Sequence, residues 1–301
     1  MRDDIIEWLL DSDPALQWQV ERDLDGAPEA QWRETRARVV TEGIGAGLLA
    51  LQGEDGLWAG GSFFPAAFDF EHPGEGQPWT ATTWSLNSLR EWGVDASVLG
   101  DTASRIDANA RWEYDSLPYW GGEVDVCINA FTLANGSWLG ADVSALRGWF
   151  PEHQLGDGGW NCEWVDGSTR SSVQSTLNAV KGILNHEIRT GDTTLREPRL
   201  RGQEYLLERR LLWRASDGGQ IAPWVDKFAY PFRGFYSALT ALDHFRTASL
   251  HDGVTPDPRL GTPSTCSGRR VARTAGGCRP DGTRATCGSR STSTADCRRG
   301  G

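Results

Sequence analysis

The chain has 301 residues, 39% of them hydrophobic and 24% charged, a composition that supports a sizeable core and excludes wholesale disorder. Its formal net charge of −11 argues against nucleic acid or an anionic membrane surface as a partner. No apolar run is long enough for a transmembrane helix, and the charged start Met1–Trp8 does not suit a secretory signal. Only Cys127 and Cys162 precede residue 261, so we expect no disulfide scaffold and a cytoplasmic location.

Two helices are predicted over residues 1–40, at the N-terminal end of the chain. Asp13 is suited to cap a helix whose first residue is Pro14, because proline fits the first helical position. Leu16, Val20 and Leu24 then recur at helical spacing, which predicts that they share a buried face.

Two turns further along share the pattern Gln-x-x-Asp-Gly-x-Trp, 102 residues apart. The first contains Gln52, Asp55, Gly56 and Trp58. The second contains Gln154, Asp157, Gly158 and Trp160. Asp-Gly favours a turn because glycine tolerates positive φ, and each pattern follows a predicted helix end, at 45–51 and 145–153. Weaker copies of this turn pattern lie at 120–122, after residue 114, and at 217–220, after residue 214. The four turns are therefore spaced by about fifty residues, which indicates a repeat of that length.

A helix is predicted after each turn, because apolar residues recur there every three to four positions. The segments are 81–89, 125–131, 174–180 and 235–239, and residues 205–214 precede the last turn as a further helix. Helix pairs repeated at this period close into a solenoid or an α/α toroid. We therefore predict an all-α fold, a single toroid domain over 1–260 that is incomplete at its C-terminal end.

The last part of the chain, residues 261–301, has a different composition. It contains eight arginines, no lysine and two aspartates, giving +6, whereas the preceding 260 residues carry −17. All fifteen tryptophans lie between Trp8 and Trp224. If the reading frame is shifted back by one base and GC-rich codons are chosen, the codons of Thr262–Arg279 can encode an amphipathic helix followed by Pro-Asp-Gly-x-Trp. This second sequence resembles the turns above. Our hypothesis is a disordered tail translated in a shifted reading frame.

The pattern Gln-x-x-Asp-Gly-x-Trp is similar to the QW motif of squalene–hopene and oxidosqualene cyclases, whose α/α barrels are shared with protein prenyltransferase β-subunits. Residues 157–163 and 167–176 also resemble the turn and helix that follow those cyclases' last QW motifs. The resemblance covers roughly residues 40–245. It implies that the QW residues are structural and that the ligand is a polyprenyl or triterpene-type hydrocarbon.

Catalysis by this family starts when the central aspartate of an Asp-x-Asp-Asp motif protonates an alkene, and that motif does not occur here. The nearest candidate is Asp125 in Glu123-Val124-Asp125-Val126-Cys127, which resembles the oxidosqualene cyclases' Val-x-Asp-Cys-Thr-Ala in its aspartate after an aliphatic stretch. The alternative is that Asp125 is a helix N-cap and Cys127 belongs to the core.

Asp125-x-Cys127 also resembles the Asp-x-Cys of prenyltransferase β-subunits, which supplies two zinc ligands. The third ligand in that family is a histidine on a later helix, where this sequence has Phe235-Tyr236-Ser237, with His244 further on. We expect no cofactor, and the alternative is a zinc ion that Asp125 and Cys127 bind. A third possibility, from another class, is a helical-repeat binding module without catalysis.

Aromatic side chains are the candidates for a cavity wall, because ring faces stabilise carbocations by about 0.5–2 kcal/mol each. The candidates are Trp79, Trp84, Trp112, Tyr119, Trp120, Phe131, Trp138 and Tyr236. Their alternative role is packed core. The aromatic segment Phe63–Phe70 is either a lid over the cavity mouth or a packed loop.

Overall fold

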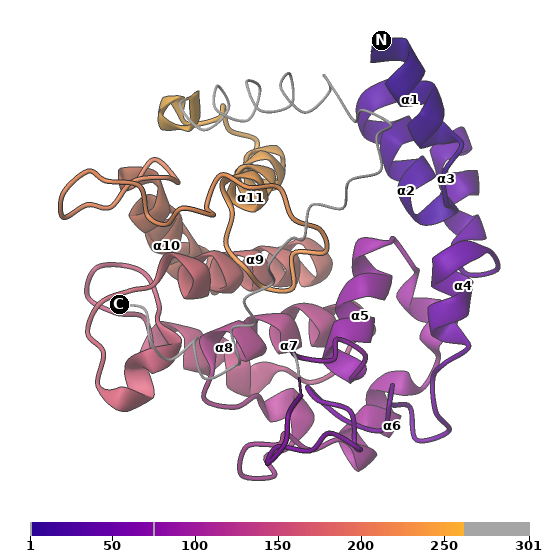
Figure 1. Ribbon diagram of the computed structural model, residues 1–301, viewed down its shortest axis with the longest axis horizontal. Helices are drawn as coiled ribbons and strands as arrows, with labels where there is room; N and C mark the ends of the chain where they lie inside the picture. The colour runs from indigo at the N-terminus through magenta and orange to yellow at the C-terminus, as the bar shows by residue number, and fades with distance from the viewer. Residues whose placement is uncertain (1, 75, 262–301) are drawn as a thin grey trace. The chain divides into compact units, whose positions relative to one another are not determined.

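The computed structural model describes residues 2–74 and 76–261, in which the helices are joined by turns and loops with only isolated β-bridges (Figure 1). The predicted all-α class is confirmed. The described part contains eleven α-helices, which divide into two compact units. The tail over 262–301, with its hypothetical frameshift, lies outside the described residues.

Unit 1 comprises Met1–Glu123 and Asn135–Val143. Its helices are α1 (Arg2–Leu10), α2 (Pro14–Val20), α3 (Glu29–Arg38), α4 (Gly43–Leu49), α5 (Thr82–Glu91) and α6 (Thr102–Asn109). Helix α2 packs against both α1 and α3, and the three form one group (Figure 1).

The start of α2 follows the sequence prediction, but its buried face does not. Asp13 accepts a hydrogen bond from the Ala15 backbone N–H at 2.9 Å, and proline opens the helix. Trp18, not Leu16, is buried, and its indole N–H donates to the Trp92 carbonyl at 2.8 Å. Leu16 and Leu24 are exposed and Val20 is buried, so the predicted apolar face is wrong at two of its three positions. Leu24 lies beyond α2, in a π-helical turn over Glu21–Asp25, whose wider period takes it off the face of Val20.

Unit 2 comprises Val124–Ala134 and the described residues from Ser144 onward. Its helices are α8 (Ser144–Glu152), α9 (Val173–Thr190), α10 (Arg196–Glu208) and α11 (Ala238–Asp252). Helix α7 (Val126–Leu139) contributes its first nine residues to unit 2 and its last five to unit 1. Helix α9 packs against α10 and α11.

The predicted helices over 81–89, 125–131 and 174–180 correspond to α5, α7 and α9. The boundaries differ from the prediction: α7, α9 and α11 extend beyond their predicted ends, and α10 begins at Arg196 rather than at 205. Helix α10 ends at Glu208 rather than at 214, because Arg210 and Leu211 adopt φ values of 44° and 61°, outside the helical region. Helix α11 begins at Ala238 rather than at 235, because extended Ser237 caps it by accepting from the Thr240 N–H at 3.1 Å.

A glycine in α9 permits close packing on α7 within unit 2. A Cβ placed on Gly182 would lie 2.5 Å from the Ala130 carbonyl oxygen, which is backbone and cannot rotate away. We expect Gly182→Ala to lower the free energy of unfolding by about 1–3 kcal/mol through this clash. Gly148 in α8 has nothing within 4 Å of such a Cβ, so Gly148→Ala should raise stability by about 0.5–1 kcal/mol. Urea unfolding of both variants compares them; equal effects would contradict the packing argument.

In the first Gln-x-x-Asp-Gly-x-Trp turn, the glutamine joins the turn to the next helix of unit 1. The side-chain amide of Gln52 donates to the Gly56 carbonyl at 3.1 Å and to Thr102 Oγ1, at the start of α6, at 2.9 Å. Asp55 accepts from the Leu57 N–H at 2.9 Å, and Gly56 has φ of 85°, where a side chain would be strained.

Trp58 completes this turn and is 1% exposed. Its indole N–H donates to the Leu48 carbonyl, near the end of α4, at 2.8 Å. Its backbone N–H donates to Thr82 Oγ1, the first residue of α5, at 3.1 Å. One residue thus satisfies a carbonyl at the end of one helix and contacts the start of the next.

In the second turn, in unit 2, the glutamine and the glycine have the same arrangement. The Gln154 amide donates to the Gly158 carbonyl at 2.7 Å and to the Pro198 carbonyl, in α10, at 2.8 Å. Gly158 has φ of 93°. Asp157 differs from its counterpart, because it accepts from the backbone N–H of Ser171 at 3.0 Å and from the Ser171 hydroxyl.

Trp160 is fully buried and repeats both bonds of Trp58. Its indole N–H donates to the Phe150 carbonyl in α8 at 2.9 Å, and its backbone N–H donates to Thr176 Oγ1 in α9 at 3.0 Å. In each turn the indole therefore binds the carbonyl ten residues upstream, and a threonine of the following helix accepts from the tryptophan backbone. The two turns therefore share the glutamine-to-glycine bond and both tryptophan bonds, but not the partners of the aspartate.

Candidate functional site

The segment that carries Asp125 lies in unit 2, immediately before α7. The Asp125 side chain is half-buried, and its backbone carbonyl accepts from the Asn129 N–H at 3.0 Å in the first turn of the helix. Trp164 holds the preceding residue, because its indole N–H donates to the Val124 carbonyl at 2.8 Å. Asp125 thus occupies a fixed place at the helix start.

Two half-buried thiols lie next to this segment. Cys162 Sγ donates to Cys127 Sγ over 3.5 Å, and the Asn178 amide donates to the same Cys127 sulfur at 3.2 Å. Ser175 Oγ lies 3.4 Å from Cys162 Sγ and donates to it. The hydrogen bond to Cys127 and burial raise the pKa of the Cys162 thiol, and the charge of Asp125 acts in the same direction. We call Cys127 and Cys162 the thiol pair.

A zinc site at Asp125 and Cys127 needs at least one more ligand. Among the described residues, the one group that brings three candidate ligand atoms within 4.8 Å of one another does not include either residue. His244, the candidate third ligand, is buried in α11, where its Nε2 lies 3.0 Å from Gln203 Nε2 and burial lowers its pKa to about 3. The donors that the sequence offered for zinc therefore do not assemble.

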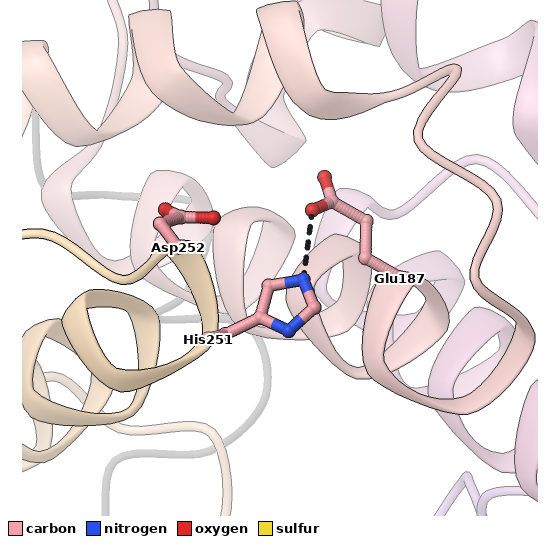
Figure 2. Close-up of side chains that lie close together, drawn as sticks. All are labelled: Glu187, His251 and Asp252. Atoms are coloured by element: carbon pink, nitrogen blue, oxygen red, sulfur yellow. Dashed lines mark ion pairs between the residues drawn. The ribbon is translucent and has the colours of Figure 1, made fainter.

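The group that does assemble is Glu187, His251 and Asp252, from α9 and the end of α11 (Figure 2). His251 Nε2 lies 3.5 Å from Glu187 Oε2. Both carboxylates are already bound by Arg199 of α10, which is fully buried: its guanidinium donates to Glu187 at 2.9 and 3.0 Å and to Asp252 at 2.8 and 3.0 Å. The arrangement is an ion-pair network that joins three helices, and sequence reasoning missed it.

Six of the predicted cavity residues lie in unit 1, where five of them form two aromatic clusters. In the first cluster Trp79 meets Trp84 edge-on at 4.6 Å between ring centroids, and Phe63 lies 4.7 Å from Trp84. The Trp84 indole N–H donates to the Phe63 carbonyl at 3.0 Å. Trp84 is 2% exposed, whereas Trp79 is half-buried.

The second cluster contains Trp112, Tyr119 and Trp120, all buried. Tyr119 stacks on Trp112 at 4.5 Å and meets Trp120 edge-on at 4.8 Å. The Tyr119 hydroxyl lies 2.8 Å from Thr83 Oγ1, and burial raises the pKa of Tyr119. The indole N–H of Trp120 donates to the Ala103 carbonyl at 3.0 Å, so the polar atoms of this cluster are bound to the protein.

Trp138 in α7, the sixth cavity candidate of unit 1, differs from the other tryptophans. It is 5% exposed, and its Nε1 is a buried donor without a hydrogen-bond partner in the described part of the chain. In unit 2, Phe131 packs on Gly234, where a Cβ would lie 2.8 Å from its ring. Tyr236 is buried, and its hydroxyl donates to the Leu211 carbonyl at 2.8 Å.

The segment Phe63–Phe70 forms the wall of an open pocket of about 290 Å³ in unit 1. Phe64, Phe68 and Phe70 line it, together with Arg111 and Glu113. The Glu113 carboxylate accepts from the backbone N–H groups of Phe63 and Phe64 at 2.9 and 3.0 Å, which fixes this loop. None of the predicted cavity residues lines the pocket.

The comparisons with known proteins find no match: no family model, no curated protein and no solved structure resembles this chain closely enough to be reported. None of the helices in the described part of the chain combines the length and apolar composition that crossing a membrane requires.

Proposed function

We propose that this chain is a terpenoid-cyclase-like protein, built from helix pairs of the α/α-toroid type, that binds a polyprenyl or triterpene-type hydrocarbon. The observation that carries the proposal is the repeated turn. Residues 52–58 and 154–160 share their sequence pattern, the glutamine-to-glycine bond, the indole bond ten residues upstream and the threonine bond downstream. A chance match of letters would not extend to these three bonds.

Asp125 is the proton donor in this proposal, and the reaction is an acid-initiated cyclisation. A carboxyl group that protonates an alkene must hold its proton near neutral pH, and surroundings that exclude water favour the protonated form. Asp125 is half-buried at a fixed helix start, where the first turn of α7 and the bond from Trp164 to Val124 hold its segment in place. Phe131 and Tyr236, the two cavity candidates that belong to the same unit as Asp125, supply ring faces for the carbocation that follows protonation.

Asp125→Asn is expected to lower turnover by about 10²–10⁴-fold, because asparagine cannot donate a proton to an alkene. The assay incubates the chain with squalene, and separately with prenyl diphosphates, and detects products by mass spectrometry. Asp166→Asn is the matched control, since Asp166 is an exposed carboxylate of the same unit. Equal turnover of the Asp125 variant and the unchanged chain would remove Asp125 from the mechanism.

The same experiment separates the other classes. Binding of squalene without any product would favour a helical-repeat binding module and contradict catalysis. Product from prenyl diphosphates alone, abolished by chelation and restored by zinc, would favour a prenyltransferase-like enzyme despite the incomplete donor set at Asp125 and Cys127.

A further inference from the structure

The two sulfurs of the thiol pair differ in their hydrogen bonds. Cys127 Sγ is the acceptor of two hydrogen bonds, from the Cys162 thiol at 3.5 Å and from the Asn178 amide at 3.2 Å. Cys162 Sγ is the donor to its partner and accepts one hydrogen bond, from the Ser175 hydroxyl at 3.4 Å. Two donors therefore point at the Cys127 sulfur, whereas Cys162 directs its own proton at its partner and receives one donor. An attacking sulfur must be free of its proton, which the surroundings of Cys127 fit better than those of Cys162. The geometry therefore gives the two cysteines different roles.

The sulfur atoms are also placed for a bond. Their separation of 3.5 Å exceeds a disulfide bond by about 1.5 Å, a shift that side-chain rotation at two half-buried residues can supply. The residues are 35 positions apart in sequence, so the fold, and not the local chain, brings them together.

We propose that Cys127 and Cys162 form a thiol–disulfide exchange site, with Cys127 as the attacking sulfur and Cys162 as the resolving sulfur. The co-reactant is a small disulfide of the glutathione class. Oxidation of the pair closes a covalent link between the start of α7 and the segment that follows Trp160.

The exchange proceeds in two balanced steps. The Cys127 thiolate attacks one sulfur of oxidised glutathione, the glutathione disulfide bond breaks, and one glutathione thiolate leaves. Cys162 then gives up its proton and attacks the Cys127 sulfur of the mixed disulfide, which releases the second glutathione. Two electrons pass from the two cysteine sulfurs to glutathione, and the two products are the protein disulfide and two molecules of reduced glutathione.

The test uses the full chain in buffers with different ratios of oxidised to reduced glutathione, followed by alkylation, trypsin digestion and mass spectrometry. Cleavage after Arg111, Arg147 and Arg170 places the two cysteines on separate peptides, 112–147 and 148–170. We expect a linked pair of these peptides in the folded chain, and several-fold less of it at the same buffer ratio in urea. Separate glutathione adducts on both peptides, or two reduced thiols in fully oxidised glutathione, would overturn the proposal.

Single variants test which of the two cysteines is the attacking one. Serines replace the other four cysteines in this background, namely Cys266, Cys278, Cys287 and Cys297. Cys162→Ser should trap a glutathione adduct on Cys127, and Cys127→Ser should form its adduct on Cys162 about tenfold more slowly. Equal rates, or a faster reaction at Cys162, would contradict the assigned roles. Circular dichroism verifies that both variants remain helical.

Discussion

Arg199→Leu is expected to lower the free energy of unfolding by about 3–5 kcal/mol, because it leaves buried carboxylates without their main partner. The side chains of Arg199 and Glu187 are both fully buried, and Asp252 is 16% exposed. Burial alone would lower the pKa of Arg199, but the bonds to Asp252 and Glu187 outweigh it and raise that pKa, so the guanidinium is charged. Urea unfolding monitored by circular dichroism measures the loss.

The control is Arg38→Leu, which removes an exposed ion pair with Glu42 at the end of α3 and should leave the free energy of unfolding nearly unchanged, because solvent screens the pair. Adding Glu187→Leu to Arg199→Leu should restore part of the stability, because the unpaired buried charge is then gone. A loss at Arg199 no larger than at Arg38 would show that the network does not hold α9, α10 and α11 together.

Trp160→Ala is expected to cost about 3–5 kcal/mol as well, through a cavity in the core of unit 2 and a lost bond at the end of α8. The ring is fully buried, and its N–H binds the Phe150 carbonyl at 2.9 Å. Trp160→Phe fills more of this space than alanine does and should cost less, although it also loses the indole N–H bond. Chemical unfolding with intrinsic fluorescence and circular dichroism compares the variants.

Trp58→Ala provides the internal comparison, because Trp58 makes the corresponding bonds in unit 1. If the two turns have the same structural role, the two losses should agree to within about 1 kcal/mol. Trp8, which is 72% exposed, is the control, and Trp8→Ala should cost less than about 0.5 kcal/mol. A near-neutral Trp160→Ala would contradict the structural role of the repeated turn.

The features that sequence predicts well here are local ones. Asp13 and Pro14 define the start of α2 because a cap and a first-turn proline act over three or four residues. The Asp-Gly turns were predictable for the same reason. The partners of Gln52 and Trp58 lie up to 50 residues away, and only the likeness between the two turns suggested that such bonds exist.

The features that sequence did not predict depend on contacts between distant helices. Leu16 and Trp18 both fit a helical period, and the choice between them depends on the carbonyl of Trp92, 74 residues away. The thiol pair joins cysteines that share no motif, and a buried Arg199 cannot be recognised in a helix with many other charged residues. For the candidate site, the sequence indicated the Asp125 segment but not the side chains of Cys162, Ser175 and Asn178 around it.

Helix α7 has a consequence for how this chain can be cut into fragments. Its residues are divided between the two units, so no single cleavage point yields both units whole. A fragment that stops at 123 lacks Gly136 and Val143, which lie against each other beside Trp120, and a fragment that begins at 135 lacks Asp125 and Cys127. Expression of separate pieces therefore requires overlapping boundaries, with one piece extending through 143 and the other starting no later than 124.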